Sequence, residues 1–168
     1  MMFGVAGCGS GNMVGTATSA SAPSESESAS FDPCALPDDA IRAVGANPAS
    51  KNAGIFGVEY PDWKICTWPA DWNFVSIMAT NLSLDRIRSN PRNVDIAPVD
   101  IAGRAGFTYH EAGGNGQPVQ TDQCDVAYQI PDGALLIRAS KKGSRDALED
   151  PCVATIRNAN VLDRYIPR

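Results

Sequence analysis

The triplet Asp-Pro-Cys occurs twice in this sequence, at residues 32–34 and 150–152. A carboxylate and a thiol this close together could serve in nucleophilic catalysis, provided that a histidine lay near enough to accept the thiol proton. The same triplet also suits the start of a helix, because aspartate caps the first turn and proline fits the first helical position. The two alternatives are therefore a catalytic pair used twice and a helix start used twice.

His110 is the one histidine among the 168 residues, so a Ser-His-Asp or Cys-His site would have to use it. The sequence lacks the Gly-x-Ser-x-Gly motif that positions a nucleophilic serine, and no cysteine of the domain has the features of a free nucleophile. We therefore expect no catalytic residues. The enzymatic alternative is a cell-envelope hydrolase that uses Glu111 or Asp122 close to His110 in a polar pocket.

Motifs for cofactors and metal ions are also missing. There is neither a dinucleotide fingerprint nor a P-loop, and the glycines around Asn115 are not followed by a helical pattern. The cysteines lack the short paired spacings typical of zinc sites. The 14 Lys and Arg residues are mostly scattered and are outnumbered by 19 Asp and Glu residues, which excludes the basic face that binds nucleic acid. We expect no cofactor, no metal ion and no nucleic-acid partner.

Three tryptophans lie close together around Cys66. They could form an aromatic wall that binds a ligand, or they could pack in the core against a disulfide, and we favour core packing. The Gly- and Gln-rich residues 111–122 are predicted to form a mobile loop. The candidate surface for a ligand or partner therefore comprises Trp63, Trp68, Trp72, His110 and Asn115.

Near the N-terminus, Val-Ala-Gly-Cys at residues 5–8 is similar to a bacterial lipobox, in which small residues precede a cysteine that becomes lipidated. Only seven residues precede Cys8 and none is basic, whereas a secretion signal begins with a basic region and a longer apolar one. We therefore interpret residues 1–8 as a truncated lipoprotein signal remnant. Residues 9–30 are rich in Ser, Thr and Gly and contain no aromatic residue, which predicts a flexible tether.

Residues 31–168 are predicted to form a single domain. Apolar residues at helical spacing predict helices, alternating apolar residues predict strands, and the Pro-Asp-Gly turn at 131–133 predicts a β-hairpin. The predicted elements are helices at 32–45, 83–90 and 151–164, and strands at 54–60, 64–69, 72–80, 104–110, 124–130 and 134–140. This order indicates an α+β fold, with a mostly antiparallel sheet and helices packed on it.

Several of these features together resemble one family: Cys8, the tether, the helix start at 32–36, Cys-Thr-Trp at 66–68 and the late helix start at 150–152. The pattern is similar to the actinobacterial lipoproteins, of mycobacterial and nocardial type, that share the domain of unknown function 3558. The likeness covers residues 31–168. It implies secretion, lipid attachment at Cys8 and two disulfides, and it implies no catalytic residue and no ligand.

The four remaining cysteines, Cys34, Cys66, Cys124 and Cys152, allow three disulfide pairings. We predict the pairs Cys34–Cys66 and Cys124–Cys152, because each joins a helix start to a nearby strand in its own half of the chain. Under this prediction the two Asp-Pro-Cys triplets are structural, since the aspartate caps a helix and the cysteine is oxidised.

The function expected from these features is that of a secreted lipoprotein, anchored to the extracytoplasmic side of the cell membrane through Cys8. Its domain is expected to bind a cell-envelope protein or a small ligand without catalysis. A carrier of a lipid or another apolar molecule is a further alternative, and it predicts a continuous apolar cavity between sheet and helix.

Overall fold

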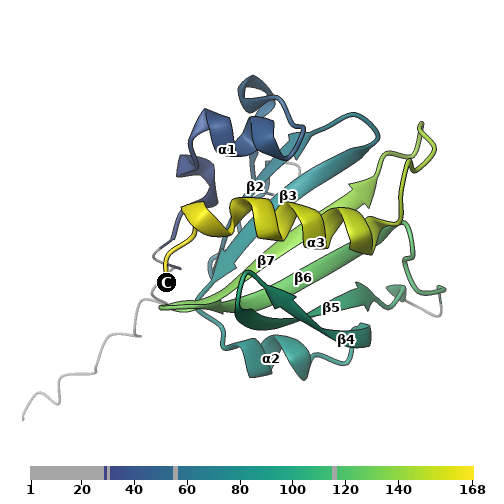
Figure 1. The fold of residues 1–168 in the computed structure, drawn as a ribbon. Helices are drawn as coiled ribbons and strands as arrows, with labels where there is room; N and C mark the ends of the chain where they lie inside the picture. The colour runs from purple at the N-terminus through teal and green to yellow at the C-terminus, as the bar shows by residue number, and fades with distance from the viewer. Residues whose placement is uncertain (1–28, 30, 55–56, 115–116) are drawn as a thin grey trace, which may run out of the picture.

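The computed structural model describes residues 29, 31–54, 57–114 and 117–168. Seven strands form one sheet in the order β1-β2-β3-β7-β6-β5-β4, and every neighbouring pair is antiparallel. Helices α1 and α3 lie on one face of the sheet, in front of it in Figure 1, and α2 packs against the other face. The predicted α+β fold is thereby confirmed. None of the helices in the described residues is long and apolar enough to cross a membrane.

The elements have the following bounds. The strands are β1 Asn52–Ala53, β2 Trp63–Pro69, β3 Asn73–Thr80, β4 Asn93–Ile101, β5 Arg104–Glu111, β6 Gln123–Ile130 and β7 Gly133–Lys141. The helices are α1 Asp38–Ala43, α2 Leu84–Arg88 and α3 Pro151–Leu162, with 3-10 turns at Pro33–Ala35, Pro48–Ser50 and Asp163–Tyr165.

The main core lies between the sheet and helices α1 and α3. Side chains alternate between the two faces of a strand, so Ile77, Ile137 and Val126, which are paired across three neighbouring strands, all point to this core. Ile41 from α1 and Leu162 from α3 cover them. Each of these five side chains is at most 1% exposed, and burying one such side chain stabilises the fold by about 1.5–3 kcal/mol.

The opposite face has a smaller apolar cluster. Phe107 and Ala127 of neighbouring strands are packed there with Ile87 of α2. Because α2 has only five residues, it covers this cluster and leaves the rest of the face without a helix. The two faces of the sheet are therefore covered unequally.

The first predicted helix, at 32–45, is wrong as a single element. A 3-10 turn at Pro33–Ala35 is followed by α1, and Pro37 stands between them as the N-cap of α1. A proline forces the preceding residue out of the helical region, and Leu36 is accordingly extended, with ψ 139°. The second proline therefore divides the element.

The predicted strand at 54–60 is also wrong. β1 ends at Ala53, and Gly54 and Gly57 have positive φ angles of 73° and 80°. The chain turns back so closely that a Cβ on Gly54 would lie 2.3 Å from the carbonyl oxygen of Val58. The apparent alternation in the sequence thus belongs to a turn, and Tyr60 forms an isolated bridge with Trp63.

Edge strand β4 was not predicted at all. Four successive residues at 95–98 are exposed, so the strand has no clear alternation of apolar and polar residues. Asp95 has a φ of 54°, and the register with β5 shifts between Val94 and Ala97, which marks a bulge. Pro98 occupies the middle of the strand, a position that proline tolerates only at a sheet edge.

Both predicted disulfides, Cys34–Cys66 and Cys124–Cys152, are confirmed. The Asp32 carboxylate accepts a hydrogen bond from the amide of Cys34 at 2.9 Å, at the start of the first 3-10 turn. Asp150 accepts hydrogen bonds from the amides of Cys152 and Val153 at 2.8 and 3.2 Å, at the start of α3. Both Asp-Pro-Cys triplets are therefore capped helix starts that are fastened to the sheet.

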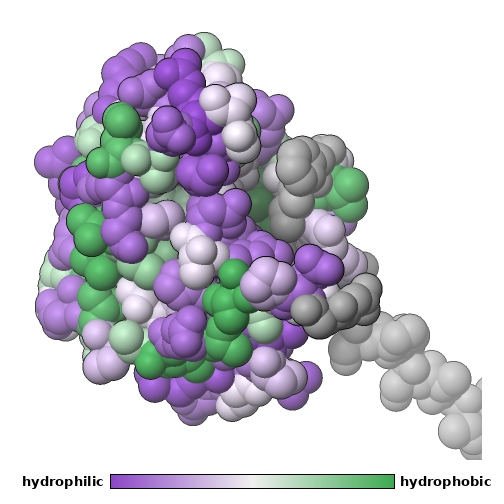
Figure 2. Space-filling model, turned by 90° about the vertical axis from the view of Figure 1, so that its right-hand side faces the viewer, coloured by the Kyte–Doolittle hydropathy of each residue, from purple (hydrophilic) through white to green (hydrophobic). Residues whose placement is uncertain are grey.

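The ends of the domain are tied to this core. Ala29, which falls in the segment predicted as a tether, is only 1% exposed and packs in the main core. At the other end, the Arg104 guanidinium pairs with Asp163 at 2.8 Å and donates a hydrogen bond to the carbonyl oxygen of Ile166 at 3.1 Å. The surface at the right-hand end of Figure 1 is mostly hydrophilic, with separate hydrophobic patches (Figure 2).

Candidate ligand-binding site

A groove of about 780 Å³ opens on the sheet face opposite α3. Its apolar lining includes Ile65, Met78 and Leu136, which belong to the three neighbouring strands β2, β3 and β7. Ile87 of α2 and the aromatic ring of Trp63 add further apolar surface. Ile65, Met78 and Leu136 are only 3–7% exposed and belong to the same buried cluster as Ile87 of α2, so they form the floor of the groove.

Local interactions hold α2 in place beside the groove. Ser83 caps the helix, and its hydroxyl accepts a hydrogen bond from the Arg86 amide at 3.2 Å. The Asn93 side chain donates to the carbonyl oxygen of Ile87 at 2.8 Å and so satisfies a group at the C-terminal end of the helix. The Arg88 guanidinium lies 4.4 Å from the centre of the Phe107 ring. A five-residue helix depends on such tertiary contacts, because short helices are marginal in isolation.

Two of the polar residues that line the groove, Arg138 and Glu111, belong to a charged cluster. The Arg138 guanidinium pairs with Asp125 at 2.9 Å and with Glu111 at 2.7 Å. Gln123 donates a hydrogen bond to the second oxygen of Glu111 at 3.1 Å. The cluster follows from the sheet register, because the two-residue turn of the β6–β7 hairpin pairs Asp125 with Arg138.

Burial of this cluster changes its protonation. Asp125 is fully buried, which raises its pKa to about 6 even though Arg138 opposes the shift. Burial alone would lower the pKa of Arg138, but the charges of Asp125 and Glu111 more than offset it and raise the pKa. Burial also raises the pKa of Tyr109, whose side chain lines the same groove. Arg138 therefore stays charged and is neutralised by its own neighbours.

Two further arginines, Arg86 and Arg92, line the groove, and both are exposed. Neither guanidinium forms an ion pair with any residue in the described part of the chain. The groove thus combines an apolar lining, a neutralised inner arginine and two outer arginines whose charge is free to meet a ligand. Such a site can hold a molecule with an apolar body and an anionic group.

A comparison with protein-family models matches residues 3–164 to the family described as "Protein of unknown function (DUF3558)". The chain belongs to the DUF3558 family. No curated protein and no solved structure matches it.

The three tryptophans of the DUF3558 domain do not form one wall. Trp63 lines the groove, whereas Trp68 points to the other face and is 1% exposed in the main core. Trp72 is 6% exposed and packs with Ala139 and Ala154. Of these residues only Trp63 lies where a groove ligand could touch it.

His110 lies away from the groove, on the α3 face of the sheet, and Glu111 faces the groove because successive side chains alternate. Asp122 is exposed and does not line the groove. His110 instead forms a cluster with Cys124 and Cys152, whose ligand atoms all lie within 4.8 Å of one another. The two sulfurs are joined in a disulfide, which leaves no thiolate to bind a metal ion.

Two of the predicted site residues, Cys8 and Asn115, lie outside the described residues. Sequence reasoning missed Met78, Leu136, Arg138 and Arg86 as groove residues. A signal existed for Arg138, because a charge in the apolar run of β7 must find a partner when it is buried. The matching acid, Asp125, stands at the opposing position of the same predicted hairpin.

Proposed function

We propose that this protein is a secreted actinobacterial lipoprotein, anchored through Cys8 to the extracytoplasmic side of the cell membrane. Its domain binds an amphipathic small molecule with an anionic group, without converting it. Two disulfides in a small domain support an oxidising compartment. The lipobox-like residues 5–8 support the anchor.

The observation that carries the ligand class is the composition of the groove. Its volume of about 780 Å³ lies within the range of small-molecule sites, roughly 300–1,000 Å³. The lining from β2, β3 and β7 is apolar, but Ile65, Met78 and Leu136 are only 3–7% exposed. An alkyl chain would therefore gain mainly by packing against them and by covering the partly exposed Trp63, at about 25 cal/mol for each Å² covered. This combination favours an amphiphile over a ligand that is wholly apolar or wholly polar.

The sign of the ligand charge follows from the arginines. Arg138 is already paired with two carboxylates, so it attracts a further anion only weakly. Arg86 and Arg92 have no such partner in the described part of the chain, and they flank the apolar lining. An anionic group at the groove entrance would thus meet two unpaired positive charges, although the chain as a whole has a net charge of −5.

The test is calorimetric titration of the soluble domain with dodecyl phosphate below its micelle concentration. Dodecyltrimethylammonium is the matched cationic probe with the same alkyl chain. We expect the phosphate to bind at least tenfold more tightly, and the double variant Arg86→Gln/Arg92→Gln to lose about tenfold in affinity, since each exposed charge pair contributes up to about 1 kcal/mol. Arg42→Gln, on α1 at the other face, is the control and should bind normally.

A second variant tests the location. Leu82 is half-buried and lines the groove, so Leu82→Asp places a charge on the apolar lining without burying it in the core, and it should abolish dodecyl phosphate binding while the domain stays folded by circular dichroism. Trp63 reports on the same event, because its fluorescence should change on binding and the change should disappear in Trp63→Phe. Equal affinity for the two probes, or unchanged binding by Leu82→Asp, would exclude the proposed ligand class or its site.

The anchor is tested separately by intact-mass measurement of the protein purified from its native host. The expected result is an acyl-modified cysteine at position 8 and a detergent-phase protein, and Cys8→Ser should release it to the aqueous phase. An unmodified Cys8 would refute the anchor and leave the groove proposal standing.

A further inference from the structure

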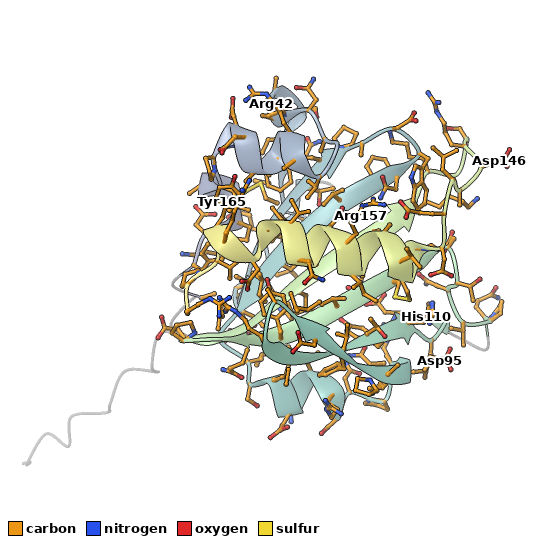
Figure 3. All side chains as sticks on the ribbon, viewed as in Figure 1. Arg42, Asp95, His110, Asp146, Arg157 and Tyr165 are labelled. Carbon is orange, nitrogen blue, oxygen red and sulfur yellow. A yellow bond between two sulfur atoms is a disulfide. The ribbon has the colours of Figure 1, made fainter. Side chains whose placement is uncertain are left out.

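The second disulfide, Cys124–Cys152, has an ionisable neighbour on the α3 face of the sheet. The Nε2 atom of His110 lies 3.7 Å from the Sγ atom of Cys152. On the other side of the ring, the Nδ1 atom lies 3.6 Å from a carboxylate oxygen of Asp95. The imidazole thus stands between a carboxylate and a sulfur, and Figure 3 shows His110 and Asp95 together at the right-hand end of the sheet.

The backbone is shaped to make this arrangement. Asp95 adopts a φ of 54° at the bulge of β4, a conformation that non-glycine residues rarely adopt. His110 and Cys124 lie on adjacent strands, one position beyond the Tyr109–Asp125 pair, and both face α3. The bulge therefore brings a carboxylate near Nδ1, a buried atom with no hydrogen-bond partner among the described residues, and strain of this kind is often found at functional sites.

The two sulfurs differ in accessibility. Cys124 is completely buried, whereas Cys152 is partly exposed at the second position of α3. Its amide is held by Asp150, so the sulfur lies in the first turn of a 12-residue helix. Thiolates are stabilised both in the first turn of a helix and beside a protonated histidine. Cys152 has both the helix position and a neighbouring imidazole that can donate a hydrogen bond to its sulfur once the disulfide opens.

The first disulfide offers an internal contrast. The Sγ atom of Cys34 lies 3.5 Å from the carbonyl oxygen of Ile65, an acceptor that disfavours a thiolate. His110 is the only histidine in the sequence, so no imidazole can stand beside Cys34 or Cys66. The stabilisation of a thiolate by histidine is therefore confined to one of the two disulfides.

We propose that Cys124–Cys152 is a redox-active disulfide that exchanges with external thiols at Cys152. A thiolate RS⁻ attacks the Sγ atom of Cys152 and forms a mixed disulfide while the bond between the two cysteine sulfurs breaks. Cys124 leaves as a thiolate and takes up the proton that the incoming thiol RSH released, while His110 stays beside Cys152. A second thiolate then attacks the sulfur of R, which releases RSSR and leaves Cys152 as a thiolate. The two thiols are oxidised, and the protein disulfide is reduced by the same two electrons.

The surface beside Cys152 suits an approaching thiol compound. Leu148 and Val153, which precede and follow it closely in the chain, are large apolar side chains with exposures of 72% and 56%. This end of the molecule faces the viewer in Figure 2, where hydrophobic patches interrupt a hydrophilic surface. This site is separate from the groove, which opens on the opposite face of the sheet.

The experiment equilibrates the folded domain with graded ratios of reduced to oxidised dithiothreitol. Free thiols are then trapped with an alkylating reagent and each disulfide is quantified by peptide mass spectrometry. We expect Cys124–Cys152 to be half reduced at a ratio at least tenfold lower than Cys34–Cys66, the size of one charge-assisted hydrogen bond to a thiolate. In urea, where the histidine is no longer adjacent, the two ratios should converge.

Two variants assign the effect to the imidazole. His110→Gln should shift the midpoint of Cys124–Cys152 by about tenfold towards that of Cys34–Cys66, which should itself not move. Asp95→Asn keeps a residue that tolerates positive φ and should cause a smaller shift in the same direction. Equal midpoints in the wild type, or a His110→Gln midpoint that does not move, would overturn the proposal.

Discussion

The two faces of the sheet are built from the same strands and differ in what covers them. On one face, α1 and α3 bury apolar side chains such as Leu135 and Ile137 completely. On the other, the five-residue α2 covers only part of the sheet, and the rest lines a groove with a charged cluster. A strand with alternating side chains can therefore serve stability on one side and binding on the other.

The adjacent residues Leu135 and Leu136 give the sharpest test of this difference, because they have the same side chain and point to opposite faces. We expect Leu135→Ala to lower the free energy of unfolding by about 4 kcal/mol, since it leaves a closed cavity in the core. Leu136→Ala should lose about 2 kcal/mol, because solvent or a ligand can fill the enlarged groove. Urea denaturation measures both, and equal losses would contradict the unequal cover.

The charged cluster should make stability depend on pH. Asp125 has a raised pKa of about 6 in the folded protein against an ordinary value of 3.8, so the folded state binds its proton more tightly than the unfolded state does. Protonated Asp125 then stabilises the folded state in full below pH 3.8, and this stabilisation is lost as the pH rises through 6. The corresponding change in the free energy of unfolding is at most about 3 kcal/mol.

The control for this pH dependence is Asp125→Asn, which cannot titrate. The difference in unfolding free energy between the wild type and this variant should fall between pH 4 and 6.5. A difference that stays constant or rises over that range would show that Asp125 has no raised pKa.

The N-caps of α3 and α2 give a second comparison of the two faces, with smaller expected losses of stability. Asp150 accepts two amide hydrogen bonds at the start of α3, and α3 packs on the closed face, so Asp150→Ala should cost about 1–2 kcal/mol. Ser83 accepts one at the start of α2, and Ser83→Ala should cost about 0.5 kcal/mol. Thermal denaturation of the two variants measures both losses, and the reverse order would mean that α2 is the better anchored helix.

The smallest effect concerns the contact between α2 and the sheet. Arg88→Gln removes the cation–π contact with Phe107 and should lower global stability by only about 0.5–1 kcal/mol. Its clearer consequence should be faster amide hydrogen exchange in α2, with α3 unchanged. If α3 exchanged faster as well, the two faces would not open independently.

The sequence was sufficient where local chemistry decides the structure. Pro131 and Asp132 define the turn of the β6–β7 hairpin, and the Asp-Pro-Cys triplets define two helix starts and lead to both disulfides. It was insufficient where a second local signal competed, as Pro37 does within the first predicted helix. It also failed for β4, because an exposed edge strand has no buried stripe to detect.

The groove could not be predicted, because its lining comes from segments that the sheet order brings together. β3 lies beside β7 although more than fifty residues separate them, and no local pattern in the sequence encodes that pairing. The pairing of Asp125 with Arg138, by contrast, follows from the register of the β6–β7 hairpin alone. The neighbourhood of His110 and Asp95 depends in addition on the β4 bulge, which has no sequence signature of its own.

The two edge strands of the sheet, β1 and β4, are poorly suited to pairing with a strand of another molecule. β1 is only two residues long, and β4 carries a bulge, a proline and Asp95 in a left-handed conformation. Each of these features prevents a second molecule from adding its own strand to the edge. Many copies of this domain could therefore stand side by side at high density without joining into continuous sheets, and the bulge that brings Asp95 close to His110 also protects the protein against aggregation.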